Sequence, residues 1–166
     1  MKEVDRTRIS EYVKFHPNAT YTEGCNGIWS VPCDIALPSA TQNEIDEASA
    51  KLLVSNGVKA IGEGANMPST LEAIEVFLEA GVLFGPAKAA NAGGVAVSAL
   101  EMSQNSMRYS WQFHEVDDKL HTIMKNIYRS AVQASEEYGH PGNLVVGANI
   151  AGFTKVADAM IAQGII

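Results

Sequence analysis

Short apolar runs alternate with longer mixed stretches in the first half of the chain. The runs at residues 31–38, 58–63 and 82–84 have the length of strands, and proline near both ends of the first run marks where its pairing should stop. Helices of roughly 10–12 residues are expected between the runs, which predicts parallel strands joined by right-handed crossovers. The expected fold class is therefore α/β: a partial Rossmann-like, doubly wound parallel sheet of about three strands, followed by a C-terminal helical region.

Capping patterns predict where the helices of this half begin. Thr41 with Glu44, and Ser69 with Glu72, have the spacing of a capping box, in which both side chains accept backbone N–H groups at a helix start. Asparagine or glycine should end the helices, because both tolerate a left-handed backbone. The expected helices span residues 41–55 and 69–81, and a shorter one is expected within residues 3–15.

The second half of the chain is helical by its hydrophobic periodicity. Residues 115–138 give the clearest pattern, because apolar side chains recur there at steps of three and four. Helices are also expected at residues 93–107 and 144–163, and His140-Pro141-Gly142 should break the chain before the last one. We interpret the apolar stripes of these helices as packing surfaces.

Composition narrows the function classes. The chain has 166 residues, 46% apolar content and a net charge of −7, which is typical of a globular domain. The acidic balance argues against nucleic acid or an anionic membrane as a partner, since both attract a basic face. No apolar run approaches the roughly 18 residues that cross a bilayer, and the first residues lack a signal segment, so a cytoplasmic location is expected. Cys25 and Cys33 are expected to be free thiols.

Three loops leave the carboxyl ends of the expected strands, where ligands bind in doubly wound sheets. They cover residues 38–43, 63–68 and 85–94 and are rich in small and amide residues. Small residues let a ligand approach the backbone, and side-chain amides suit a carboxamide or a ribose. Each loop alone is also compatible with a plain turn, but three of them on one edge favour a ligand site.

Longer strings of residues carry a specific resemblance. They are residues 32–38 (PCDIALP), 63–68 (EGANMP), 88–95 (KAANAGGV), 147–153 (GANIAGF) and 157–160 (ADAM). In this order and spacing they resemble the hexameric, NADP-using glutamate dehydrogenases of the Glu/Leu/Phe/Val dehydrogenase family, over nearly the whole chain.

The resemblance implies a division of the chain and a set of ligands. Residues 1–92 would be the second half of the nicotinamide cofactor-binding domain, and residues 93–166 a helical region that packs against a substrate domain. NADP is the implied cofactor, with NAD left open, and glutamate or 2-oxoglutarate is the implied substrate. The full-length family implies a homo-oligomer, a hexamer, with neither nucleic acid nor membrane as a partner.

The resemblance also assigns site residues. Ser98 matches the serine that binds the side-chain carboxylate of the substrate, and Val95 matches a residue flanking that pocket. Steps of four and three residues place Asn91, Val95 and Ser98 on one helix face. The residues assigned to the cofactor are Ala40, Thr41, Asn66 and Asn91.

Two parts of the family pattern do not occur in the sequence. It has no GxGxxG or GxGxxA fingerprint for a pyrophosphate, and the family's catalytic lysine and aspartate would lie upstream of Met1. We therefore expect no catalytic residue here, and an isolated chain that is an inactive fragment. No metal site is expected either, because Asp118 interrupts the HExxH-like start at His114.

Two alternatives stay open at this point. The chain could belong to a related dehydrogenase of an apolar amino acid, for which a carboxylate-binding Ser98 would have no use. It could instead be a non-catalytic oligomerisation or interaction module, because a sheet of three strands has two unpaired edges.

Overall fold

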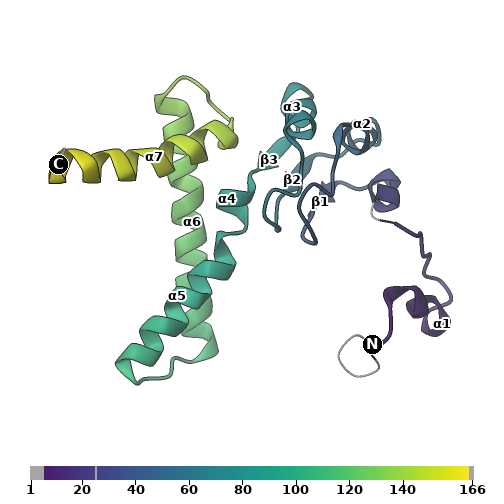
Figure 1. The fold of residues 1–166 in the computed structure, drawn as a ribbon, viewed down its shortest axis with the longest axis horizontal. Coiled ribbons are helices and arrows are strands. Elements are labelled where there is room, and N and C mark those ends of the chain that lie inside the picture. Colours follow the sequence, from purple (N-terminus) through teal and green to yellow (C-terminus); the bar gives the residue numbers. More distant parts are fainter. Residues whose placement is uncertain (1–5, 25, 165–166) are drawn as a thin grey trace.

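The chain folds as a small sheet region joined to a helical arm (Figure 1) in the computed structural model, which describes residues 6–24 and 26–164. It starts with η1 (Ile9–Glu11), α1 (Tyr12–Phe15) and η2 (Asn26–Ser30). The sheet region contains β1 (Ile35–Ala36), α2 (Glu47–Ser55), β2 (Ala60–Gly62), α3 (Leu71–Glu79) and β3 (Leu83–Gly85). The arm consists of α4 (Ala87–Ala90), α5 (Ala92–Met107), α6 (Phe113–Glu137) and α7 (Leu144–Gln163).

The strands form a parallel sheet in the order β1-β2-β3, which confirms the predicted class and pairing. Ala36, Ile61 and Phe84 are register partners, so their side chains point to the same face, which α2 and α3 cover (Figure 1). These three side chains are buried, whereas Ile35 and Leu83 on the opposite face are 60% and 73% exposed. In the described residues, helices therefore cover one face of the sheet and leave the other open.

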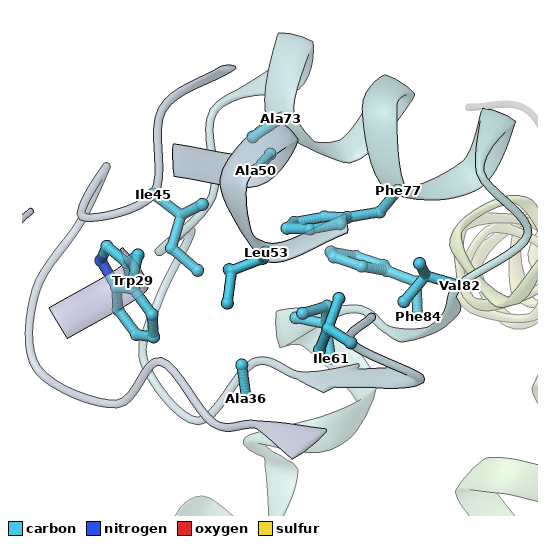
Figure 2. Packing of buried hydrophobic residues seen from close by; sticks show 11 residues of the cluster. Trp29, Ala36, Ile45, Ala50, Leu53, Ile61, Ala73, Phe77, Val82 and Phe84 are labelled. Atoms are coloured by element: carbon cyan, nitrogen blue, oxygen red, sulfur yellow. The ribbon is translucent and has the colours of Figure 1, made fainter. Parts of the chain in front are cut away.

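The core lies between the sheet and the two helices that cover it. Figure 2 shows Leu53 of α2 and Phe77 of α3 directed toward Ile61 and Phe84 of the strands. The rings of Phe77 and Phe84 stack with their centroids 5.9 Å apart. Phe77 is fully buried, and burial of such a side chain contributes about 2–3 kcal/mol. Trp29 closes one end of the core.

The first expected strand is shorter than predicted. Within residues 31–38 the structure pairs only β1, because the flanking residues include Pro32 and Pro38, which cannot donate to a ladder. Cys33 in this run is a free thiol, as expected, and Cys25 lies outside the described residues. The helix expected within residues 3–15 appears as η1 and α1, with residues 3–5 also outside the described ranges.

The first capping prediction was wrong. Glu44 does accept the backbone N–H of Thr41, at 3.3 Å, but no helix starts there. Asn43 has a left-handed φ of 54°, which interrupts a helical course between them. α2 begins only after Asp46, whose Oδ1 accepts the backbone N–H of Ser49 at 2.8 Å. The predicted end of this helix at Ser55 is confirmed.

The second capping prediction was wrong by one residue. Thr70 caps α3, because its Oγ1 accepts the backbone N–H of Ala73 at 3.3 Å. Ser69 instead pairs with Ile45 in an isolated parallel bridge outside the three strands. The hydroxyl of Ser69 is buried and has no hydrogen-bond partner. The strand-like pairing therefore takes the position that the capping pattern assigned to the helix.

The helices of the arm agree closely with the periodicity. α7 has the predicted bounds, and α5 and α6 begin one and two residues before the predicted starts. The earlier start of α6 follows from a capping box between Gln112 and Glu115. Figure 1 shows α5 running beside α6 and α7 crossing α6 near its end. α4 is a single short helix that was not predicted.

α7 approaches α6 closely and leaves much of its own apolar surface exposed. A Cβ on Gly147 would overlap the carbonyl oxygen of Ala131, so only glycine allows this crossing. Within the described residues, α7 has the length and mean hydropathy, 1.4 over 18 residues, of a helix able to cross a membrane. This helix was not expected from the sequence as a long apolar run, because Lys155 and Asp158 interrupt its apolar residues. Length and composition alone do not place this helix in a membrane.

Candidate functional site

The loops that follow β1 and β2 lie against one another. Gly64 and Ala65 both donate their backbone N–H groups to the carbonyl oxygen of Pro38, at 2.9 and 3.1 Å. The backbone N–H of Asn43 donates to the carbonyl oxygen of Met67 at 2.9 Å. The two loops therefore form one continuous surface at the carboxyl end of the sheet, where doubly wound folds bind ligands.

A buried carboxylate joins the second loop to the third. Glu63, at the end of β2, is only 2% exposed. Its Oε1 accepts the backbone N–H of Ser69 at 3.1 Å, and its Oε2 accepts the backbone N–H of Ala87 at 2.7 Å. Each oxygen thus holds a different loop, and the buried charge is compensated by two N–H donors.

Two of the predicted cofactor residues meet at this edge. The Nδ2 of Asn91 donates to the Oδ1 of Asn66 at 2.6 Å and to the carbonyl oxygen of Ala65 at 3.2 Å. Asn91 ends α4 and Asn66 lies in the loop after β2, so the contact joins residues 25 positions apart. This contact leaves the side-chain oxygen of Asn91 and the side-chain nitrogen of Asn66 for a ligand.

Ala40 and Thr41 lie in the loop after β1. Their backbone N–H groups both donate to Oε1 of Glu44, at 3.0 and 3.3 Å, and both residues are exposed. The carboxylate of Glu44 itself is buried, and its backbone carbonyl accepts the indole N–H of Trp29 at 2.9 Å. Glu44 therefore fixes the loop that carries these two predicted residues.

Val95 and Ser98 lie in the first turns of α5. Both are exposed, and their spacing puts them on one face of the helix. The Ser98 hydroxyl donates to the carbonyl oxygen of Gly94 at 3.3 Å, so its oxygen remains able to accept. A carboxylate could be bound only if the hydroxyl rotated away from this long bond.

A cavity of about 520 Å³ opens beside the Asn66–Asn91 pair. Residues of the second loop, of α3, of α4 and of the start of α7 line it. Lys88 and Asn149 are among them, and the Lys88 ammonium group donates to Asn149 Oδ1. Amide, ammonium and apolar groups thus face one space, a combination suited to a polar organic ligand.

One titratable group with a shifted pKa lies beside this cavity: a hydrogen bond from its own backbone N–H, and then one with the side chain of Thr70, lower the pKa of Glu72 at the start of α3. The other groups with shifted pKa values belong to other elements. The hydrogen bond and charge of Lys59 lower the pKa of Asp34, and both residues stand at the opposite, amino end of the sheet. Backbone and side-chain hydrogen bonds from Ser49 lower the pKa of Asp46 at the start of α2. In residues 6–24 and 26–164, no group of three His, Cys, Asp or Glu residues is placed to hold a metal ion. The polar groups that line the cavity include the side-chain amides of Asn66, Asn91 and Asn149, the ammonium group of Lys88 and the carboxylate of Glu63.

Comparison with known proteins identifies the family. The model of the Glutamate/Leucine/Phenylalanine/Valine dehydrogenase family matches residues 1–164 of the chain. The chain belongs to this family. The predicted resemblance, which rested on short strings of residues, is confirmed over nearly the whole sequence.

Individual relatives place the chain close to one branch of the Glu/Leu/Phe/Val dehydrogenases. An NADP-specific glutamate dehydrogenase of Helicobacter pylori strain J99 is 55% identical over 171 residues, covering 99% of this chain and 38% of the relative. A protein of the same name from Salmonella typhimurium is 58% identical over 159 residues, covering 96% and 35%. The chain thus spans little more than a third of the length of the relatives it matches.

A solved structure from this family has the same fold. The glutamate dehydrogenase of Plasmodium falciparum aligns with a TM-score of 0.93 and 47% identity, covering all of this chain and 36% of that one. The helical arm and the three-stranded parallel sheet are therefore part of a fold that a dehydrogenase in this family also has.

Several residues of the candidate site were not predicted. Glu63, Lys88 and Asn149 lie in strings that carry the resemblance, yet no role followed from their order in the sequence. Lys88 and Asn149 are 61 positions apart, and only the fold brings them together. Their place in the matched strings is the one signal that could have marked them.

Proposed function

We propose that this chain supplies the nicotinamide side of the cleft, and one substrate contact, in an NADP-dependent glutamate dehydrogenase. The observation that supports this most is the Asn66–Asn91 contact, which brings two family-matched amides together at the carboxyl end of a parallel sheet. The names of relatives that are 55% and 58% identical support NADP and glutamate as the ligands. The overall reaction is the reversible oxidation of L-glutamate to 2-oxoglutarate and ammonia.

In this proposal the chain binds and orients, and it transfers no proton. Asn66 and Asn91 offer one free donor and one free acceptor, which fit a carboxamide or a ribose, and Ala40 and Thr41 border the same loops. NADP, when bound, accepts or supplies the hydride at its nicotinamide ring. The protein groups keep that ring at a fixed place relative to the substrate.

The proposed substrate contact lies only a few residues after the proposed cofactor contact in the sequence. Asn91 ends α4 and α5 starts at the next residue, so one helix carries Asn91 at its start and Val95 and Ser98 on its first turns. The Ser98 hydroxyl donates to the side-chain carboxylate of glutamate, and Val95 borders that group.

Exposed apolar surfaces support a larger assembly around this chain. Parallel sheets are normally covered on both faces, but Ile35 and Leu83 are open here. On the arm, Phe113 and Phe153 are 85% and 70% exposed. We assign residues 1–92 to the cofactor domain and residues 93–166 to a helical region that packs on a substrate domain. We assign the remaining apolar surface to contacts between subunits of a homo-oligomer. The family resemblance implies that this oligomer is a hexamer.

The test is a chimeric enzyme. This chain replaces the matching segment of the Salmonella typhimurium relative, and the purified chimera is assayed for glutamate-dependent NADP reduction beside the unaltered relative. The chimera should be active, and the chain alone should show negligible turnover because none of its residues is assigned to proton transfer. A folded chimera that reduces NADP with leucine but not with glutamate would favour the apolar amino-acid alternative. A folded chimera with neither activity would favour the interaction module.

A further inference from the structure

Glu63 connects two loops of the proposed site through opposite oxygens of one carboxylate. It is 2% exposed and stands at the end of β2. One oxygen accepts the backbone N–H of Ser69 at 3.1 Å, and the other accepts the backbone N–H of Ala87, 24 positions further along, at 2.7 Å. Hydrogen bonds to a carboxylate are roughly twice as strong as those between neutral groups. The contact therefore ties the start of α4 firmly to the loop after β2.

α4 is attached to that same loop at its other end. Asn91, which ends α4, donates to the carbonyl oxygen of Ala65 and to Oδ1 of Asn66. Both ends of this one-turn helix are thus bonded to the loop of residues 63–69. α4 cannot rotate against the loop without losing hydrogen bonds at one end or the other.

This double attachment determines where α5 starts. α5 begins directly after Asn91, and Ser98 lies on its second turn. The direction in which α5 leaves the sheet depends on the orientation of α4 and on α6, which packs against both helices. Glu63 is thereby linked to Ser98 through α4, although the two side chains belong to different elements.

We infer that Glu63 is a positioning residue that couples the cofactor-side loop of Asn66 to the substrate-side helix of Ser98. The inference deepens the proposed function and rests on it. The coupling requires two acceptor oxygens and not merely a side chain of this size. Glutamine has one acceptor and one N–H₂ donor, so it would direct a donor at the backbone N–H of either Ser69 or Ala87. An unpaired buried donor is costly, so one of the two loops should be released.

Amide hydrogen exchange on the chain itself tests the attachment without any assay of activity. Glu63→Ala should accelerate exchange of both the Ser69 and Ala87 amides by roughly tenfold or more, and Glu63→Gln should accelerate one of them. Glu75→Gln makes the same chemical change on the exposed side of α3 and should alter neither. Unchanged exchange at both amides in Glu63→Ala would overturn the inference.

A measurement on the unsubstituted chain keeps the inference testable if the Glu63 variants do not fold. Because each donates to the buried carboxylate, the backbone N–H groups of Ser69 and Ala87 should both exchange more slowly than unprotected amides, by roughly tenfold or more. An unprotected amide at either Ser69 or Ala87 would overturn the double attachment.

The functional consequence is measured in the chimera described above. Glu63→Gln should raise KM for both NADP and glutamate, by roughly tenfold each, while Glu75→Gln leaves both unchanged. A purely structural role would lower the active fraction, and hence apparent kcat, without moving either KM. Unchanged KM values in a chimera that carries Glu63→Gln would overturn the coupling. If the unsubstituted chimera is inactive, the proposed function fails, and hydrogen exchange still decides whether Glu63 holds the two loops.

Discussion

The side-chain nitrogen of Asn91 donates to the side-chain oxygen of Asn66 at 2.6 Å. These residues come from two different loops at the carboxyl end of the sheet, and the family resemblance of their motifs assigns both to the cofactor. This hydrogen bond leaves two side-chain atoms for a ligand: the oxygen of Asn91 and the nitrogen of Asn66. The loop after β2 and the helix that leads to Ser98 therefore meet in one amide pair.

Asn91→Asp should damage cofactor binding in the chimera. The substitution keeps the size of the side chain but replaces the N–H₂ donor with a second acceptor, which then faces Oδ1 of Asn66. We expect KM for NADP to rise by roughly tenfold, measured by steady-state kinetics. Asn105→Asp, an exposed change further along α5, serves as the control and should leave that KM unaltered. Equal KM values in the two variants would contradict the assignment of Asn91.

Ser98→Val should mainly weaken binding of the dicarboxylic substrate. The variant removes the proposed donor to the substrate carboxylate, so KM for 2-oxoglutarate should rise by roughly tenfold while KM for NADP stays the same. Ser103→Val is a matched control, because the Ser103 hydroxyl also donates to the carbonyl four residues back, at 2.9 Å, in the same helix. If Ser98→Val and Ser103→Val gave the same KM for 2-oxoglutarate, Ser98 would not be a substrate contact.

Substitutions at two adjacent residues distinguish the helix cap from the bridge residue. Thr70→Ala removes the acceptor for the backbone N–H of Ala73 and should cost about 1 kcal/mol of the free energy of unfolding. Ser69→Ala removes a buried hydroxyl without a partner, so it should be neutral or stabilise by up to about 1 kcal/mol. Urea unfolding of both variants measures the difference. A larger loss for Ser69→Ala than for Thr70→Ala would restore Ser69 as the cap.

Two glycines of α7 should respond in opposite directions to alanine. A Cβ at Gly147 would overlap the backbone of Ala131, so Gly147→Ala should push α7 away from α6 and cost about 1–3 kcal/mol. A Cβ at Gly152 would meet no atom within 4 Å, so Gly152→Ala should stabilise the helix by about 0.5–1 kcal/mol. Thermal unfolding of the two variants measures the signs. A stable Gly147→Ala protein would show that the helices do not cross this closely.

The cap of α2 should depend on pH. Hydrogen bonds from Ser49 lower the pKa of Asp46 below its ordinary value of 3.8, so its stabilising effect is complete above that value and is lost as pH falls through the lower, folded-state pKa. Asp46→Ala should therefore cost about 1 kcal/mol near neutral pH and less as the solution becomes strongly acidic. Urea unfolding across this range measures the difference between the two proteins. A constant difference would mean that the charge of Asp46 has no part in the cap.

Most of the fold could be predicted because hydrophobic patterns are local. The three parallel strands and α5, α6 and α7 follow from runs and periodicities that a short stretch of sequence contains. The predicted starts of α2 and α3 were wrong because a loop can also use the polar residues that form a capping box. At Glu44 the carboxylate accepts the N–H groups of a loop, and at Ser69 a pairing with Ile45 replaced the cap.

The site could be predicted as a set of loops but not as a set of contacts. The family-matched strings identified Asn66 and Asn91, and the parallel sheet explained why their loops share an edge. The bond between them, and the two loops held by Glu63, depend on distances across 24 and 25 positions that no local pattern encodes. The open face of the sheet was also not foreseen, because strand patterns do not show which face lacks helices.

Glutamate-dependent NADP reduction, measured side by side for the chimera and for this chain alone, tests the central claim most directly. We expect turnover in the chimera close to that of the Salmonella typhimurium relative, and negligible turnover in the chain alone. A well-folded chimera without glutamate-dependent activity, or an isolated chain that reduces NADP at an ordinary rate, would contradict the account.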